Sequence, residues 1–345
     1  MAHSSFGRRQ FLLGSATLAG AAVLGASAPA RLLAAQQQTL TLYNGQHKKT
    51  TAAVVRAFTN ATGINVDIRN GHSSQLANQI IEEGERSPAD VFYSEESPPV
   101  VALANRGLLA RLQPQTLEQI PPRYRAKDDT WTGISARSRV VAYNTKMISP
   151  DELPASVLDF ATEAWKGKVA YVPTSGAFQE QIIAINLLKG RAATLKWLSG
   201  LKAYGQQYNG NMSALRAVES GEIATALIND YYWYSLASEF GSENLSSAIF
   251  HQGNQDPGAL ITLSAAGVLK SAKNMAAAQK LLSFMVSAAG QQAVVDSVAE
   301  YPLRAGVESP YPLKPFDELD APDITAADLG DGADALTLER EAGLA

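Results

Sequence analysis

Two adjacent tyrosines, Tyr231 and Tyr232, follow an apolar segment at 223–228, with Asn229 and Asp230 between. Neighbouring side chains on a continuing strand point to opposite faces, so both phenols reach one site only if the strand ends here and the backbone turns. Aromatic side chains usually serve as packing. Without further evidence, two rings packed at a strand end are the simpler interpretation of this pair.

Other side chains with ligand atoms also follow predicted strands. They are His47 after strand 39–43, Glu95 after strand 89–93, and the turn Ser175-Gly176 after strand 169–172. In open α/β sheets, ligands bind beyond the carboxyl ends of the strands. Their shared position predicts that these groups meet the tyrosines at one site.

One imidazole, one carboxylate and two phenols form an unusual set of donors. A tyrosine, with a pKa of about 10, becomes a ligand only when a highly charged, oxygen-preferring cation displaces its proton. With Fe³⁺, two phenolates and one carboxylate balance the charge of the ion, and His47 adds a neutral donor. Zn²⁺ prefers more nitrogen or sulfur, while Ca²⁺ and Mg²⁺ prefer carboxylates and carbonyls. The set therefore favours ferric iron.

The turn T-S-G-A-F at 174–178 favours binding of a small anion. Gly176 lets the backbone turn tightly, and the helix that follows begins with free amide donors and the positive end of its dipole. Asn211 and Asn229 could add side-chain donors, and an anion held here could complete the coordination of the metal. An ordinary helix N-cap, with a glycine for packing, explains the same turn equally well.

These groups need a scaffold of alternating strands and helices. Strands are predicted at 39–43, 64–68, 89–93, 139–144, 169–172, 223–228 and 260–269, and helices at 49–62, 75–85, 100–106, 179–188, 192–201, 212–220, 275–287 and 291–298. The opening β-α-β-α-β order predicts a mainly parallel, doubly wound sheet. A second α/β unit begins near residue 165, and no linker separates the two. The acidic segment from residue 317 onward is predicted to form a loop and a surface helix.

Composition and charge exclude several classes of protein. The chain has 345 residues and is 46% hydrophobic, which allows two domains with a large core. A net charge of −4 without a basic run argues against nucleic acid as a partner. Because the sequence has no cysteine, disulfides and thiolate metal sites are excluded.

Residues 1–35 have the pattern of an export signal. Paired arginines, Arg8-Arg9, precede an apolar run of small residues and a small-residue cleavage site at Ala34-Ala35, and they resemble a twin-arginine (Tat) signal. A membrane anchor is the alternative, although the run is only moderately apolar. Without the three arginines of this segment, 26 basic residues face 33 acidic ones, a net charge of −7. Since no cysteine is present for lipid attachment, we expect a free periplasmic protein.

No motif of an enzyme active site accompanies these groups. Ser175-Gly176 lacks a G-x-S-x-G elbow, and no H-E-x-x-H helix, P-loop or G-x-G-x-x-G fingerprint occurs. We therefore expect a binding protein and not an enzyme. One alternative is an organic or oxyanion ligand at Ser175-Gly176, with the tyrosines as stacking walls. The other is a metal-dependent enzyme, which would need a general base that the sequence does not supply.

A series of short segments runs through the chain in a characteristic order: LYNGQHK (42–48), ADVFYSE (89–95), SARSRVV (135–141), TSGAF (174–178), ALINDYYWY (226–234), QDPGA (255–259) and YPLR (301–304). Together they resemble the ferric-ion-binding proteins of bacterial periplasms, the bacterial transferrins that supply iron to ABC importers. The resemblance extends from about residue 39 to the C-terminus.

The resemblance implies an α/β fold of two doubly wound lobes joined by two crossing strands, of the class II periplasmic-binding-protein type. Lobe 1 would comprise 39–137 and 262–312, lobe 2 would comprise 138–261 and 313–345, and the ligand would lie between them. The implied iron ligands are His47, Glu95, Tyr231 and Tyr232, and the implied holders of a synergistic anion, usually phosphate, are Ser175, Gly176, Ala177, Asn211 and Asn229. We further expect a monomer that delivers Fe³⁺ to an ABC permease in the inner membrane.

A further group is expected behind the ligands and not on the metal: Arg137, Arg139, Tyr143, Asp230 and Arg304. The arginines could line a cleft or pair with acidic residues. Packing is the simpler explanation of Tyr143, and Asp90 is expected to order its strand.

Glu96 departs from the pattern, because many of the relatives carry Gln directly after the ligand glutamate, where it helps to hold the anion. A second carboxylate beside Glu95 would repel phosphate by on the order of a few kcal/mol at short range. Glu96 could turn to solvent, share a proton with the anion, or ligate iron and displace the anion. We expect phosphate to be a weaker partner here, with carbonate or citrate as substitutes.

Overall fold

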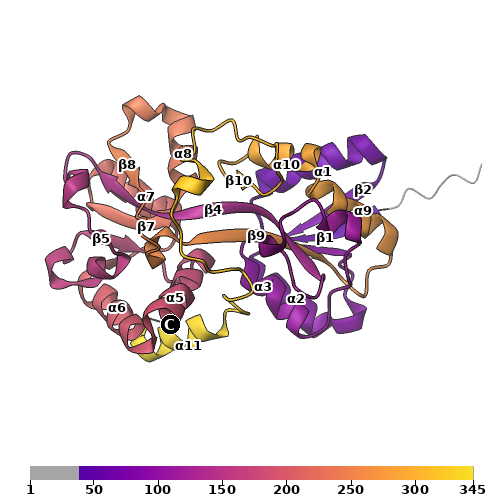
Figure 1. Ribbon diagram of the computed structural model, residues 1–345, viewed down its shortest axis with the longest axis horizontal. Coiled ribbons are helices and arrows are strands. Elements are labelled where there is room, and N and C mark those ends of the chain that lie inside the picture. The colour runs from indigo at the N-terminus through magenta and orange to yellow at the C-terminus, as the bar shows by residue number, and fades with distance from the viewer. Residues whose placement is uncertain (1–38, 345) are drawn as a thin grey trace, which may run out of the picture. The chain divides into compact units, whose positions relative to one another are not determined.

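Residues 39–344 are described in a computed structural model as alternating strands and helices (Figure 1). The strands are β1 (Thr39–Asn44), β2 (Asn65–Asn70), β3 (Val91–Ser94), β4 (Trp131–Asn144), β5 (Val169–Tyr171), β6 (Gln206–Gln207), β7 (Thr225–Asn229), β8 (Ser247–Phe250), β9 (Ile261–Val268) and β10 (Tyr301–Pro302). The helices are α1 (Lys48–Thr62), α2 (Ser73–Glu83), α3 (Ser97–Asn105), α4 (Pro114–Leu117), α5 (Gly176–Lys189), α6 (Arg191–Tyr204), α7 (Asn211–Ser220), α8 (Asp230–Phe240), α9 (Met275–Met285), α10 (Ala288–Val295) and α11 (Ala333–Ala342). Within this range, no helix is both long and apolar enough to cross a membrane. The predicted export signal at 1–35 lies outside the described residues.

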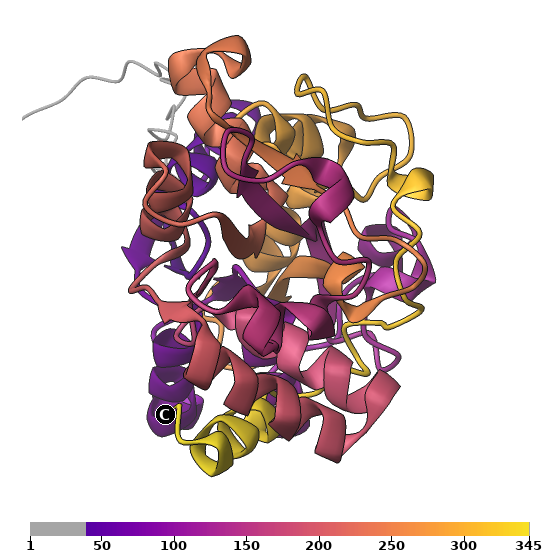
Figure 2. The ribbon, with the colours of Figure 1, turned by 90° about the vertical axis from the view of Figure 1, so that its left-hand side faces the viewer.

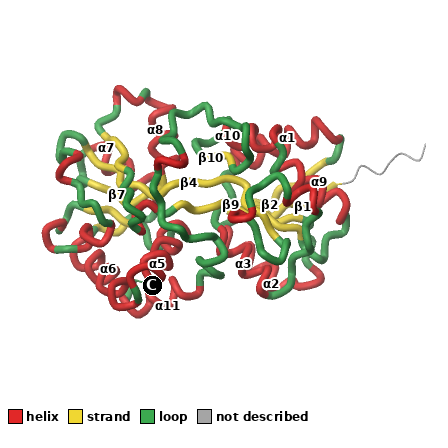
Figure 3. The backbone as a smooth tube through the Cα atoms, viewed as in Figure 1, coloured by secondary structure: helices red, strands yellow, loops and turns green. Residues whose placement is uncertain are grey.

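The strands form two parallel units connected by antiparallel strands. Their order is β2-β1-β3-β9-β4-β7-β5-β6, with β8 and β10 paired to β4. β1 is parallel to β2 and β3, and β5 is parallel to β6 and β7. β9 pairs antiparallel with β3 and β4, and β4 pairs antiparallel with β7. The predicted β-α-β order is confirmed, and β4 and β9 run side by side between the two units (Figures 1 and 3).

Strand β4 is the longest connection between the two units. All 14 of its residues are buried, and it pairs with β9 along its first half and with β7 and β8 along its second. The sequence predicted only the part at 139–144. At the irregularity near Gly133, a β-carbon would lie 2.7 Å from a methyl group of Leu303 and 2.9 Å from the Tyr124 carbonyl oxygen. A side chain at Gly133 would therefore force the strand away from its neighbours.

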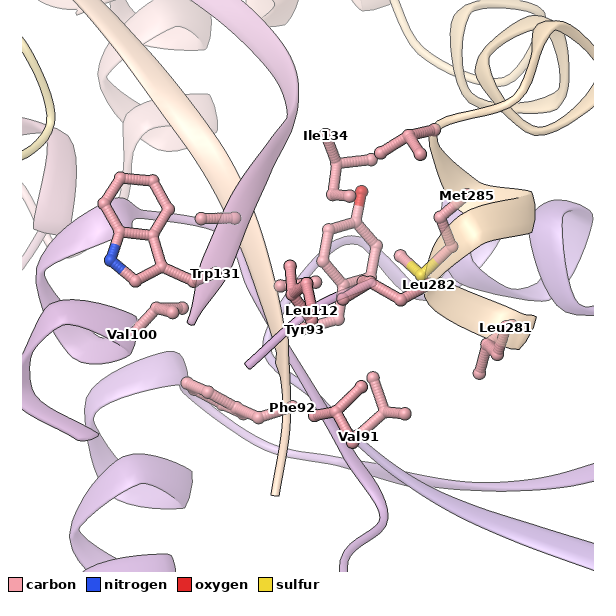
Figure 4. Packing of buried hydrophobic residues seen from close by; sticks show 14 of the residues in the cluster. Val91, Phe92, Tyr93, Val100, Leu112, Trp131, Ile134, Leu281, Leu282 and Met285 are labelled. Carbon is pink, nitrogen blue, oxygen red and sulfur yellow. The ribbon is translucent and has the colours of Figure 1, made fainter. Parts of the chain in front are cut away.

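The hydrophobic core divides along β4 and β9. One cluster draws on residues 40–136 and 263–326 and includes Phe92 and Tyr93 of β3, Trp131 of β4 and Leu282 of α9 (Figure 4). The second and third clusters draw on residues 140–260 and 329–338. This division supports the predicted lobes, whose boundaries stay a prediction. Ala326 packs in the first cluster, and Ile324, close to it in the chain, packs against the second.

Helix α11 packs against α5 and α6 (Figure 2). It buries Ala335, Leu338 and Glu339. The predicted surface helix in this part of the chain is confirmed, since most residues of α11 are exposed, and its buried side contributes to the second core cluster.

Candidate metal centre

The four predicted iron ligands each lie near the start of a helix, directly after a strand. His47 is the N-cap residue of α1, and Glu95 lies between β3 and α3. Strand β7 ends at Asn229, and α8 begins with the next residue. Tyr231 and Tyr232 therefore share the first turn of α8, with ring centroids 4.2 Å apart. The turn that the sequence required beneath the two tyrosines is confirmed.

Two side chains converge on one carboxylate oxygen of Glu95. The Tyr231 hydroxyl donates a hydrogen bond to Oε1 of Glu95 at 2.9 Å, and Nε2 of His47 lies 3.6 Å from the same oxygen. The His47 and Tyr231 rings meet edge to face, with centroids 5.0 Å apart. Nε2 of His47 is buried and has no hydrogen-bond partner in the described part of the chain. Such a nitrogen is a ready donor for a metal ion.

Tyr232 belongs to a second set of contacts, which connects the tyrosines with the predicted anion turn. The side-chain amide of Asn211 donates to the Tyr232 hydroxyl at 3.2 Å and to the Ser175 hydroxyl at 3.0 Å. Asn211 is the first residue of α7, and Ser175 is the N-cap residue of α5. Asn229 is the N-cap residue of α8, and its side-chain oxygen accepts a hydrogen bond from Arg139 at 3.1 Å. The two predicted groups are thus neighbours, while the roles of their members stay predictions.

Both phenols hold their protons tightly. Burial, and then the negative charge of Glu95, raise the pKa of Tyr231 well above 10. The same two causes, in the same order, raise the pKa of Tyr232 to about 12. At neutral pH both groups are therefore neutral in the metal-free protein, and only a strongly charged cation could displace their protons.

A metal ion at this place depends on the tyrosines. Among residues 39–344, no cluster of three or more His, Cys, Asp or Glu side chains could hold a metal. A cavity of about 450 Å³, lined by His47, Tyr231 and Tyr232 among others, lies beside the site. The combination of few carboxylates with two phenols fits a hard trivalent cation better than Zn²⁺, Ca²⁺ or Mg²⁺.

Glu96 lies against Gly176, the first residue of α5. Cδ and Oε1 of Glu96 are 2.5 Å from the position that a β-carbon on Gly176 would take, so only glycine leaves room for the carboxyl group. Burial, and then the charge of Glu95, raise the pKa of Glu96 to about 8. The next residue, Ala177, is buried. The carboxyl group of Glu96 therefore faces the predicted anion turn and does not extend freely into solvent.

Arg137 and Glu300 form a buried ion pair behind Glu95. Nη1 of Arg137 lies 3.9 Å from Oε1 of Glu300, and neither side chain is exposed. Nη2 of Arg137 donates to the backbone carbonyl oxygen of Glu95, and Ser135 donates to the second carboxylate oxygen of Glu300. The guanidinium group thus holds the backbone segment that carries Glu95.

Asp230 and Arg139 hold the backbone that carries the tyrosines. Oδ1 of Asp230 accepts hydrogen bonds from the backbone amides of Tyr231 at 2.9 Å and Ser138 at 3.3 Å. Burial raises the pKa of Asp230 to about 8. Arg139 is fully buried and donates to Asn229. Both residues therefore lie behind the predicted ligands.

The remaining predicted residues take part in packing. Tyr143 is buried in the second core cluster, and Arg304 donates to the side chain of Gln119 at 2.6 Å. Asp90 accepts a hydrogen bond from the backbone amide of Thr41 at 2.8 Å and so orders the start of β3, as predicted.

Glu180 is a buried carboxyl group near the site that sequence reasoning missed. Its Oε1 accepts a hydrogen bond from the Ser97 hydroxyl at 3.1 Å, which connects α5 with the start of α3. Its Oε2 is buried without a partner among residues 39–344, and burial raises the pKa of Glu180 to about 7. The one available signal was an acidic residue in a helix that is otherwise mostly apolar.

An α/β fold of this topology, with a polar site at the ends of its strands, is typical of proteins that carry a solute. Residues 44–292 match the family of bacterial extracellular solute-binding proteins, and the chain belongs to this family. It is 47% identical over 308 residues to the major ferric iron-binding protein of Neisseria meningitidis serogroup A, covering 88% of this chain and 93% of the relative. It is 38% identical over 312 residues to the Fe(3+)-binding periplasmic protein of Serratia marcescens, covering 90% and 92%.

Solved structures share the fold. Iron-bound HitA from Pseudomonas aeruginosa matches with 52% identity and a TM-score of 0.87, covering 89% of this chain and 100% of that one. The ferric binding protein from Campylobacter jejuni matches with 26% identity and a TM-score of 0.81, covering 88% and 99%. These matches confirm the predicted class II periplasmic-binding-protein fold.

Proposed function

We propose that this protein binds ferric iron and carries it to an ABC importer. The observation that carries the proposal is the convergence of Tyr231 and His47 on Glu95, with the ring centroids of Tyr231 and Tyr232 only 4.2 Å apart. The names of relatives that cover most of the chain support the same cargo.

The donor set suits Fe³⁺ in charge as well as in chemistry. Phenolates at Tyr231 and Tyr232 and the carboxylate of Glu95 would together carry three negative charges, and His47 would add the nitrogen that has no other partner. Metal binding releases the protons of its ligands, so the tightly held phenolic protons give the site its selectivity for a strongly acidic cation.

The ligands come from opposite sides of the predicted lobe boundary. His47 and Glu95 belong to the first predicted lobe, while the tyrosines and the Ser175-Gly176 turn belong to the second. An ion bound by both sets of ligands favours a closed form, in which the two predicted lobes meet around the ion. Iron would therefore stabilise this closed form and not an open form in which the two sets of ligands lie apart. A permease that recognises the closed form would then accept only loaded protein.

The proposed setting is the periplasm, with a permease of the inner membrane as the partner and a monomer as the working form. The name of the Serratia relative supports this setting. In this proposal the protein is a carrier and performs no reaction on its cargo.

Titration of the purified protein with ferric iron tests the proposal. Two tyrosinate ligands should produce a visible charge-transfer band that saturates at one iron per chain. Saturable binding of an oxyanion without iron, or of an organic ligand without the band, would favour the alternative ligand class instead. Turnover of a substrate by the iron-loaded protein would favour an enzyme.

A further inference from the structure

The start of α5 is built to receive a negative charge. The amides of the first turn of a helix have no intrahelical partner, and the helix dipole places partial positive charge there. Ser175, the N-cap residue, makes no capping hydrogen bond with its side chain. Its hydroxyl group accepts from Asn211 instead. The amide of Phe178 already donates to the backbone carbonyl oxygen of Ser175 at 3.0 Å. The amides of Gly176 and Ala177 are therefore the ones left for another acceptor at the start of this 14-residue helix.

The side chain of Glu96 lies beside the first residue of this helix. Cγ of Glu96 lies 2.7 Å, and its Cδ and Oε1 lie 2.5 Å, from the position of a β-carbon on Gly176. Gly176 begins a regular helix, where alanine is a better residue than glycine. The missing side chain is thus explained by the space that the carboxyl group needs.

Carboxylates already crowd this position. Glu96, Gly176 and Glu180 line one small cavity of about 130 Å³, and Glu95 is the neighbouring residue in the chain. A phosphate at the start of α5 would have to displace Glu96 and would lie close to the carboxyl groups of Glu95 and Glu180. The same crowding favours a cation beside them.

We propose that the carboxylate of Glu96 takes the place of an external anion at the start of α5, so that this chain binds ferric iron without phosphate or carbonate. The inference rests on the proposed function and deepens it, because it assigns the anion to the protein itself. Glu96 thereby decides which anions the iron site needs.

The test compares wild type with Glu96→Gln, which keeps the size of the side chain and removes its charge. Apoprotein receives ferrous chloride under CO2-free oxygen, so that iron oxidises on the protein without an added chelator, in buffer freed of phosphate and bicarbonate. Inorganic phosphate or bicarbonate is then titrated in. The charge-transfer band reports iron, and phosphate analysis of the desalted complex reports the anion. Glu118→Gln is the matched control, because Glu118 is exposed and lies outside the site.

We expect wild type and Glu118→Gln to load iron equally well with and without either anion and to retain no phosphate. Glu96→Gln should gain a dependence on phosphate or bicarbonate of about tenfold or more in apparent affinity, the effect of losing one charge-assisted contact. Gly176→Ala adds a methyl group against the carboxyl group of Glu96. In a protein that keeps Glu96, this substitution should weaken iron loading in the absence of phosphate and bicarbonate. In a Glu96→Ala background the same substitution should weaken iron loading less, because the carboxyl group is already gone.

Two results would overturn the inference. One is wild type that needs phosphate as much as Glu96→Gln does. The other is one phosphate retained per iron in wild type. In both cases the band is present and the proposed function stands. Absence of the band from wild type in every buffer would overturn the proposed function, and the inference with it.

Discussion

Tyr231 donates a hydrogen bond to Glu95 at 2.9 Å, although the two residues are 136 positions apart in the chain. The contact joins the first turn of α8 to the segment after β3. Both groups are proposed iron ligands, so the proton between them occupies a place that the ion would take. In the proposed site, iron binding displaces this proton and places the metal ion between the two oxygens. The affinity for iron, the absorption band and the release of protons therefore all report on this contact.

Removing the hydroxyl of Tyr231 should abolish tight iron binding. Tyr231→Phe keeps the packed ring and loses one anionic ligand. We expect the affinity to fall by more than about 100-fold, since loss of a residue that merely supports a ligand already costs about 10–100-fold. The charge-transfer band should weaken and shift. Competition with citrate, followed by this band, measures both effects.

Tyr234→Phe is the matched control, one helical turn further along α8. The Tyr234 hydroxyl donates to the backbone carbonyl oxygen of Pro312 at 3.0 Å, and its loss should cost about 1 kcal/mol of unfolding free energy. Iron affinity and the band should be unchanged. Equal affinity in Tyr231→Phe and Tyr234→Phe would show that Tyr231 is not a ligand.

Iron binding should release protons. Since the pKa of Tyr231 lies well above 10 and that of Tyr232 at about 12, both phenols are protonated between pH 5 and 9 in the apoprotein. If both bind as phenolates, the apparent affinity should rise with pH, with a contribution of about two log units per pH unit from the phenols. A pH-stat measures the protons released per iron. At saturation, Tyr232→Phe should release one proton fewer than wild type with the same iron source, and an equal release would exclude Tyr232 as a phenolate ligand.

The apoprotein should be more stable in mild acid than in mild base. Glu180 has a folded pKa of about 7 and Glu96 one of about 8, against 4.5 for an unperturbed glutamate. Because these folded values are raised, the stabilisation is fully present below pH 4.5 and is lost as the pH rises through 7 and 8. Urea unfolding between pH 5 and 8 should show this fall.

Glu180→Gln should flatten that dependence, because the amide cannot ionise and still accepts from Ser97. A tenfold change in an acid dissociation constant corresponds to about 1.4 kcal/mol, so the difference in stability between pH 5 and 8 should shrink by at most a few kcal/mol. Glu118→Gln, an exposed position, should retain the slope of wild type. The same slope in Glu180→Gln and wild type would mean that Glu180 is already ionised in the folded protein.

The sequence predicts the local part of this architecture well. Strand and helix positions follow from apolar periodicity and from glycines such as Gly63, which ends α1 in a left-handed conformation with φ 72°. The strand ends at His47, Glu95 and Asn229 could be identified for the same reason. The first half of β4 could not, because Arg137 breaks the apolar pattern and its burial depends on an acidic partner far away in the chain.

The same limit applies to the two acidic residues near the anion turn. The sequence left three outcomes open for Glu96, because its contact with Gly176 is made between segments 80 positions apart. Glu180 was missed, since nothing in its own helix indicates that Ser97 lies opposite. Such contacts depend on how separate elements pack, which local patterns do not encode.

The buried pair of Arg137 and Glu300 should stabilise the fold and hold Glu95 in place. Arg137→Gln leaves Glu300 buried without its positive partner, which should cost about 3–5 kcal/mol of unfolding free energy in the apoprotein. The variant also loses the hydrogen bond to the Glu95 carbonyl oxygen, so iron affinity should fall as well. Urea unfolding and iron competition measure the two effects separately.

Two further variants complete this experiment. Adding Glu300→Gln to Arg137→Gln should recover part of the stability, because the unpaired charge is removed, but it should not restore iron affinity, because the contact with Glu95 stays lost. Arg304→Gln is the control, since Arg304 is partly exposed and bonded to Gln119, and should cost about 1 kcal/mol. If Arg137→Gln were no more destabilised than Arg304→Gln, the ion pair would not stabilise the fold.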